Sequence, residues 1–102
     1  MGRLIVQTIP DRNSIAAFVA SAEGMPELGL GLANFKVRST VPGADGSHLV
    51  IASVQASTLR GFYLLDLAAA GCTPLRRGLY VFDLIVERGD EVGQALSSVI
   101  LT

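Results

Sequence analysis

The chain has 102 residues, of which 50% are hydrophobic and 17% charged, and its formal net charge is −1. This length suits one domain, spanning residues 1–102, and the composition excludes a disordered chain, which needs low hydrophobicity and high net charge. The balanced charge predicts no nucleic-acid partner, because a phosphate-binding surface needs an excess of Lys and Arg.

Residues that build metal and redox sites are scarce. The only cysteine is Cys72 and the only histidine is His48, which excludes an internal disulfide and a Cys-based zinc site. We therefore expect no cofactor and no metal. No apolar stretch reaches the ~18 residues of a membrane helix, so no membrane insertion is expected. The N-terminus lacks a signal-peptide pattern, which leaves two readings open, a cytoplasmic protein or a domain excised from a longer secreted protein.

The first half of the chain reads as short β-rich runs separated by turn residues. Arg3–Ile9 predicts a strand that ends at the turn over 10–13. Ser14–Ala22 fits either a strand or a helix face, and we favour a strand because the first strand needs a partner. Asn34–Val41 alternates between apolar and polar residues, which is typical of a half-buried strand. His48–Ala56 is also strand-like.

The second half continues the pattern. Gly61–Ala69 and Gly78–Arg88 are long apolar runs, and a charged tip over 87–91 predicts a hairpin into a last strand, Glu91–Thr102. Seven strands at this spacing, with no long helix between them, favour an all-β sandwich or barrel over a parallel α/β sheet.

Two motifs carry a resemblance to a known family. Leu75–Phe82 reads Leu-x-x-Gly-x-Tyr-x-Phe and resembles the entry to strand F of immunoglobulin-like domains. Gly31–Val37 resembles the opening of a mid-domain strand in bacterial sandwich modules. The chain is therefore similar to bacterial immunoglobulin-like and carboxypeptidase-regulatory-like (prealbumin-type) domains, although it lacks Trp and has Arg76 where antibody-type domains usually have Asp.

The resemblance implies a seven-stranded antiparallel immunoglobulin-like β-sandwich. It also implies that the Tyr80 hydroxyl bonds backbone upstream and pins the preceding corner, while Phe82 fills the place of the second cysteine of that fold. Such domains usually act as spacers, accessory modules or binding platforms.

Period-two alternation assigns an inside and an outside to each strand. The expected inner residues are Leu4, Val6, Phe35, Val37, Tyr63, Leu65, Tyr80, Phe82, Leu84 and Val99. The outward residues of the two long runs remain strongly apolar, which is typical of an interface. The candidate interface consists of Phe62, Leu64, Asp66, Val81, Asp83 and Ile85.

The sequence therefore predicts a non-catalytic accessory or assembly module, of bacterial or phage type, that contacts a protein partner or forms a homo-oligomer. The alternative is a carbohydrate- or small-ligand-binding module, which would need exposed aromatic rings. An enzyme would rest on Asp66 and Asp83 acting as a coupled pair of carboxylates, whereas alternation makes them separate surface residues. Cys72 is interpreted as an inert thiol, and Asp45–Ser47 as a turn rather than a calcium loop.

Overall fold

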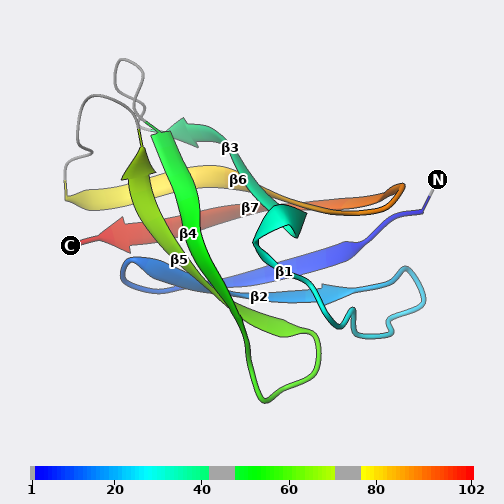
Figure 1. Cartoon of the computed structure of the whole chain (residues 1–102). Coiled ribbons are helices and arrows are strands. Elements are labelled where there is room, and N and C mark those ends of the chain that lie inside the picture. Colours follow the sequence, from blue (N-terminus) through cyan, green and yellow to red (C-terminus); the bar gives the residue numbers. More distant parts are fainter. Residues whose placement is uncertain (1, 42–47, 71–76) are drawn as a thin grey trace.

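A computed structural model describes residues 2–41, 48–70 and 77–102. Seven strands form a four-stranded sheet of order β1-β2-β5-β4 and a three-stranded sheet of order β3-β6-β7 (Figure 1). Their bounds, with one short 3-10 helix η1, are β1 Ile5–Pro10, β2 Ser14–Ala20, η1 Leu32–Asn34, β3 Phe35–Val41, β4 His48–Ala56, β5 Phe62–Ala70, β6 Gly78–Arg88 and β7 Glu91–Leu101. All strand pairs within the sheets are antiparallel. The predicted all-β, two-sheet architecture is confirmed.

The ambiguous segment Ser14–Ala22 forms a strand. β2 lies between β1 and β5, and its Ile15, Ala17 and Val19 are buried while the residues between them are half-buried. This period of two is the pattern of a strand whose one side faces a core.

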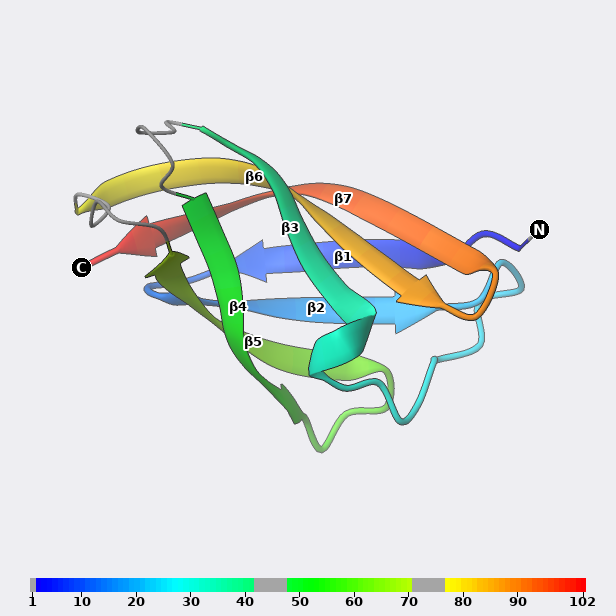
Figure 2. The same cartoon turned by 45° about the horizontal axis from the view of Figure 1, so that its top comes forward.

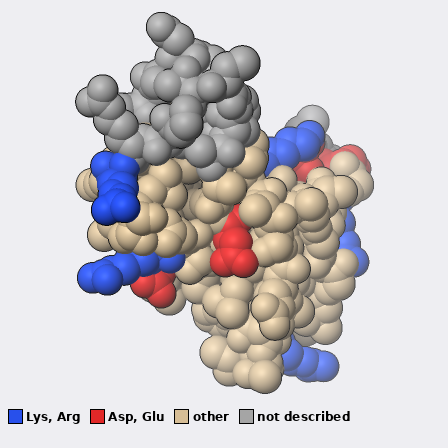
Figure 3. Space-filling model, turned by 60° about the vertical axis from the view of Figure 1, so that its left-hand side comes forward, with Lys and Arg blue, Asp and Glu red and all other residues tan. Residues whose placement is uncertain are grey.

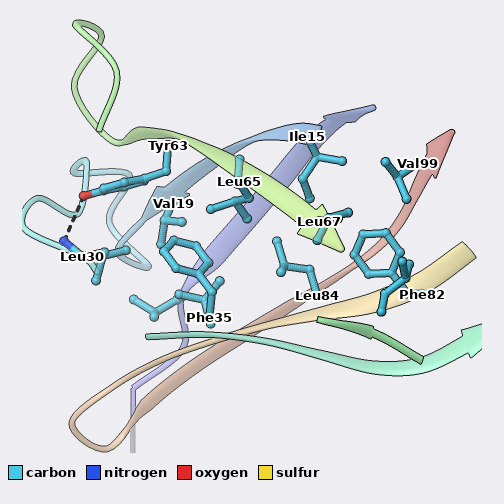
Figure 4. Packing of buried hydrophobic residues seen from close by; sticks show 14 of the residues in the cluster. Ile15, Val19, Leu30, Phe35, Tyr63, Leu65, Leu67, Phe82, Leu84 and Val99 are labelled. Atoms are coloured by element: carbon cyan, nitrogen blue, oxygen red, sulfur yellow. Dashed lines mark hydrogen bonds between the residues drawn. The ribbon is translucent and has the colours of Figure 1, made fainter. Parts of the chain in front are cut away.

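The core lies between the two sheets (Figure 4). Of the ten expected inner residues, eight are buried in it, and Val6 and Val37 are partly buried against it. Leu30 and Leu49 are buried as well. The local sequence did not predict their burial, because Leu30 lies in an expected loop and Leu49 at the start of an expected strand.

The expected alternation of Asn34–Val41 fails at its end. Ser39 has a φ of 58°, and the register with β6 shifts between Arg38 and Val41. Ser39 is consequently exposed, and Thr40 accepts a hydrogen bond on Oγ1 from the Leu49 N–H at 3.2 Å. A bulge reverses the side to which the following residues point, which simple alternation cannot anticipate.

The two sides of the sandwich differ. On what we call the closed side, β1 runs beside β7 (Figure 2), with parallel bridges Arg3↔Val92 and Arg12↔Ile100. On the open side, β3 and β4 are the edge strands of their sheets, and a cleft of about 350 Å³ lies between them.

A buried tyrosine pins a loop, but at another place than expected. Tyr63 on β5 donates a hydrogen bond to the Glu27 carbonyl at 2.6 Å and accepts one from the Leu30 N–H at 3.3 Å (Figure 4). Tyr80 is buried, as expected. The corner that it was predicted to pin lies in 71–76, outside the described residues. The interpretations of Cys72 and of Asp45–Ser47 fall outside them too.

Candidate interaction surfaces

The six residues of the candidate interface lie on two different surfaces. Phe62, Leu64 and Asp66 belong to β5 of the four-stranded sheet, and the other three belong to β6 of the three-stranded sheet. All six point away from the core, because their neighbours Tyr63, Leu65, Phe82 and Leu84 point into it. Since the sheets pack face to face, the two outer surfaces point in opposite directions.

The outer surface of the four-stranded sheet, here the four-strand face, carries a row of apolar side chains across three strands. Ile9 lies opposite Ala16, which in turn lies opposite Leu64. Ile9 is 62% exposed and Leu64 is 48% exposed. Beside this row the rings of Phe18 and Phe62 contact each other, with centroids 4.9 Å apart.

The outer surface of the three-stranded sheet, here the three-strand face, is also apolar. Leu79 on β6 lies opposite Ile100 on β7, and they are 59% and 44% exposed. Leu96 is 75% exposed, while the predicted Val81 is half-buried near it. The predicted Ile85 is only 9% exposed, so it contributes little free surface.

Sequence reasoning missed Leu79, Leu96 and Ile100, although a signal for them existed. Tyr80 and Val99 were expected inside, and the same alternation puts Leu79 and Ile100 outside together with Leu96. The candidate list took the outward residues of β6 only from Val81 to Ile85, and it did not extend back to Leu79 or on to the outward residues of β7.

Asp66 and Asp83 do not form a couple. They lie on opposite faces of the sandwich, so the hypothesis of two cooperating carboxylates fails on geometry. Asp66 is exposed and accepts a hydrogen bond on Oδ2 from the Ser53 hydroxyl at 2.8 Å. Asp83 is half-buried and lies opposite Arg38 of β3 in the sheet register.

Charged side chains are thinly spread over the surface. Figure 3 shows a side of the molecule where a broad uncharged area separates a few acidic and basic groups. An ion pair joins Lys36 Nζ to Glu87 Oε1 at 2.7 Å, and both side chains are well exposed, at 64% and 44%. Such a pair contributes little free energy, so the apolar residues dominate the chemistry of both faces.

Shallow hollows lie at both sides of the sandwich, where the two sheets meet. The cleft on the open side is lined by Leu32, Phe35, Lys36, Val37, Leu49, Val50 and Ile51. On the closed side, a hollow of about 300 Å³ lies between β1 and the three-strand face and is lined by Thr8, Pro10, Val81, Leu96, Ser97 and Ser98. Beside it the Thr8 and Ser97 hydroxyls lie 2.8 Å apart and share a hydrogen bond between the two sheets.

In the parts of the chain that the structure describes, the side chains of His, Cys, Asp and Glu do not gather into a group of three or more that could hold a metal ion. Across the same residues, no helix has the length and apolar character of a membrane span. Comparison with protein-family models, with curated proteins and with solved structures finds no match to this chain.

Proposed function

We propose that this chain is an immunoglobulin-like β-sandwich that serves as a non-catalytic accessory or assembly module and acts through protein–protein contacts or self-association. The strand order supports the immunoglobulin-like part. Lettered A to G along the chain, the two sheets read A-B-E-D and C-F-G, which is the order in constant-type immunoglobulin domains.

The apolar side chains on both outer faces carry the proposal. Ile9, Leu79 and Leu96 are each more than half exposed, at 62%, 59% and 75%. Burying one such side chain completely stabilises a contact by roughly 1.5–3 kcal/mol. Residues of this kind grouped on one surface are typical of an interface, and two such surfaces on opposite sides let one copy contact two neighbours.

Sedimentation velocity over a concentration series tests this function. We expect the wild-type chain to associate as concentration rises. Leu96→Lys should shift the equilibrium toward the monomer without lowering the melting temperature, because the leucine lies outside the core. Thr58→Lys is the control, since it adds the same charge at an exposed position between β4 and β5, away from the three-strand face, and should leave association unchanged.

A wild-type chain that stays monomeric at millimolar concentration would overturn self-association. In that case a pull-down from a lysate of the native host tests for a different protein partner, with the wild-type chain, Leu96→Lys and Leu64→Lys as separate baits. The assembly role fails if the wild-type chain retains no protein that is lost with at least one of the two lysine variants.

The alternative, a carbohydrate- or small-ligand-binding module, draws on one observation, the Phe18–Phe62 pair on the four-strand face. A sugar platform needs an exposed, flat aromatic surface. These two rings are tilted by 42° and half-buried, which favours the assembly role. A glycan array with the wild-type chain and with Phe62→Ala distinguishes the two, because only a sugar-binding module would give hits that the variant loses.

A further inference from the structure

The outer edge of β4 has fewer features that prevent pairing with another chain than the other sheet edges have. Edge strands usually carry charged residues, proline or a covering segment, which prevent such pairing. On the closed side, β1 and β7 run side by side, and the residues that flank β1 pair with β7. β3 carries Lys36, Arg38 and the irregularity at Ser39. The nine residues of β4 include a bulge but no Asp, Glu, Lys, Arg or Pro.

Hydrogen bonds of neighbouring strands show which backbone groups of β4 face outward. The Leu67 N–H donates to the Asn13 carbonyl at 2.9 Å, toward β2. Leu67 and its β4 partner Ile51 are therefore a non-hydrogen-bonded pair, and the Ile51 N–H and C=O point to the free edge. The Leu49 N–H points the same way but is already taken by Thr40 Oγ1.

The second half of β4 presents further free groups. At its end, the Ser57 N–H donates to the Phe62 carbonyl at 2.9 Å, toward β5. Alternation then directs the N–H and C=O of Ala56, and of Val54 before it, toward the free edge. The available edge runs from Ile51 to Ala56, and among the described residues no strand pairs with it.

The cleft on the open side lies beside the start of this edge. Most of its lining residues are apolar, such as Leu32, Phe35 and Ile51, and its volume of about 350 Å³ exceeds that of one large side chain. A strand paired with β4 points every second side chain toward the sandwich interior. One such side chain, at the end nearest Ile51, would enter the cleft.

We propose that the free edge of β4 binds an extended peptide segment of a partner protein, which adds a fifth strand to the four-stranded sheet and places an apolar side chain in the cleft. Backbone hydrogen bonds supply affinity in this mode of recognition, and alternate side chains supply specificity. A second copy of this chain fits the site less well. Its own β4 keeps Leu49 and Val54 against its own core, so it has no inward side chain left for the cleft.

This inference rests on the proposed protein-interaction function but uses a surface separate from the two outer faces. The probe is a fluorescein-labelled peptide of nine residues, the length of β4, with alternating Val and Thr between terminal lysines. A shuffled peptide with its valines adjacent is the control. We expect saturable anisotropy with the alternating peptide only. The amides of Ile51, Val54 and Ala56 should exchange about tenfold more slowly when it is bound.

Two variants challenge the site. Ala56→Pro removes an edge N–H and leaves the β4–β5 hydrogen bonds and the core intact. Ile51→Lys brings a charge to the cleft. Each should weaken peptide binding about tenfold, in line with the loss of one or two hydrogen bonds or of one apolar contact. Leu64→Lys on the four-strand face is the matched control and should bind the peptide as the wild-type chain does.

The outcomes separate this inference from the proposed function. No binding, equal binding of the shuffled peptide, protection at another edge or full affinity of Ala56→Pro would each overturn the edge site. A dimer that Ala56→Pro abolishes, without peptide binding, would overturn it in favour of a second copy. Association that Leu96→Lys abolishes while peptide binding persists bears on the outer faces alone.

Discussion

At the closed side, the two sheets are joined by backbone hydrogen bonds, whereas at the open side side chains surround a cleft. The Leu4 N–H donates to the Val92 carbonyl at 3.0 Å, and the Asn13 N–H donates to the Ile100 carbonyl at 2.7 Å. At the open side, the Thr40 hydroxyl meets the Leu49 N–H beside apolar walls. Backbone pairing brings the strands close where it occurs, at the two ends of β1, although a hollow of about 300 Å³ remains beside β1 on the same side. At the open side no such backbone pairing joins the described strands of the two sheets.

This difference indicates where the small domain tolerates amino-acid substitutions. At Gly93 on the closed side, the chain around β1 approaches β7 so closely that even a methyl group lacks room, whereas residues around the open side still face solvent in part. We therefore expect substitutions at the closed side to act on folding, and most substitutions at the open side to act on binding.

The largest effect is expected for Gly93→Ala at the closed side. A Cβ there would lie 2.6 Å from the Leu4 carbonyl oxygen and 2.9 Å from Val6 Cγ2, so β1 would have to move away. Overpacking of this kind costs about 1–3 kcal/mol, and we expect the upper end because the Cβ meets a backbone oxygen rather than a flexible side chain. Gly→Ala within a strand alone stabilises by only roughly 0.5–1 kcal/mol. Urea denaturation should show a clear net loss in the free energy of unfolding.

Gly31→Ala is the matched control for this prediction. Nothing lies within 4 Å of a Cβ at Gly31, and its φ of −129° suits any residue. Its free energy of unfolding should stay within about 0.5 kcal/mol of the wild-type value. Equal free energies of unfolding for the two variants would mean that β1 and β7 are not held in close contact. The closed side would then not differ from the open side in this respect.

Tyr63→Phe, with an intermediate effect, tests the loop that leads to the open side. The Tyr63 hydroxyl bonds both the Glu27 carbonyl and the Leu30 N–H, and this ring is 2% exposed. Its removal leaves the buried Leu30 N–H without this partner, while water can reach the half-buried Glu27 carbonyl, so we expect a cost of about 1 kcal/mol. The ring itself remains, so the core is not emptied.

Thermal and urea denaturation measure this loss. Hydrogen exchange locates it, because the Leu30 amide should lose protection far more than amides of β6 and β7. Uniform loss of protection in every strand would contradict a loop-specific role. An unchanged Leu30 amide would show that the Arg88 guanidinium, which donates to the Leu28 carbonyl, holds this loop without the tyrosine.

The strands on both sides of the sandwich could be predicted from the sequence, but the contacts between the two sheets at each side could not. Alternation and turn residues are local, so they located β6 at its observed bounds, Gly78–Arg88, and the strand after the hairpin at its observed start, Glu91. The bridge between Arg3 and Val92 joins segments far apart in the chain. Nothing near either residue encodes it.

The candidate interface shows the same limit. Alternation correctly pointed Leu64 and Val81 away from the core, because it needs only the identity of the neighbouring residues. It could not tell that β5 and β6 belong to different sheets, since that depends on long-range pairing. Two apolar runs that read alike in the sequence thus contribute to opposite faces of the molecule.

The smallest effect is expected for Lys36→Met at the open side. Lys36 forms an ion pair with Glu87, but both groups are largely in water, at 64% and 44% exposed. Solvent screens their attraction, and ordering two long side chains costs entropy, so exposed pairs contribute about 0–1 kcal/mol. Methionine keeps the length of the side chain. The free energy of unfolding should change by less than about 0.5 kcal/mol, in low salt as in high salt.

This small expected change makes the variant a sharp test. Glu87→Gln, which removes the other partner, should give an equally small change, and the double variant should equal the sum of the two. Both residues belong to the three-stranded sheet, Lys36 on β3 and Glu87 on β6. A loss above about 1.5 kcal/mol that vanishes in high salt would therefore mean that charge, rather than backbone pairing and apolar packing, holds the edge strand β3 in its sheet. The position of β3 beside the cleft would then depend on ionic strength, and the contrast between the two sides would have to be abandoned.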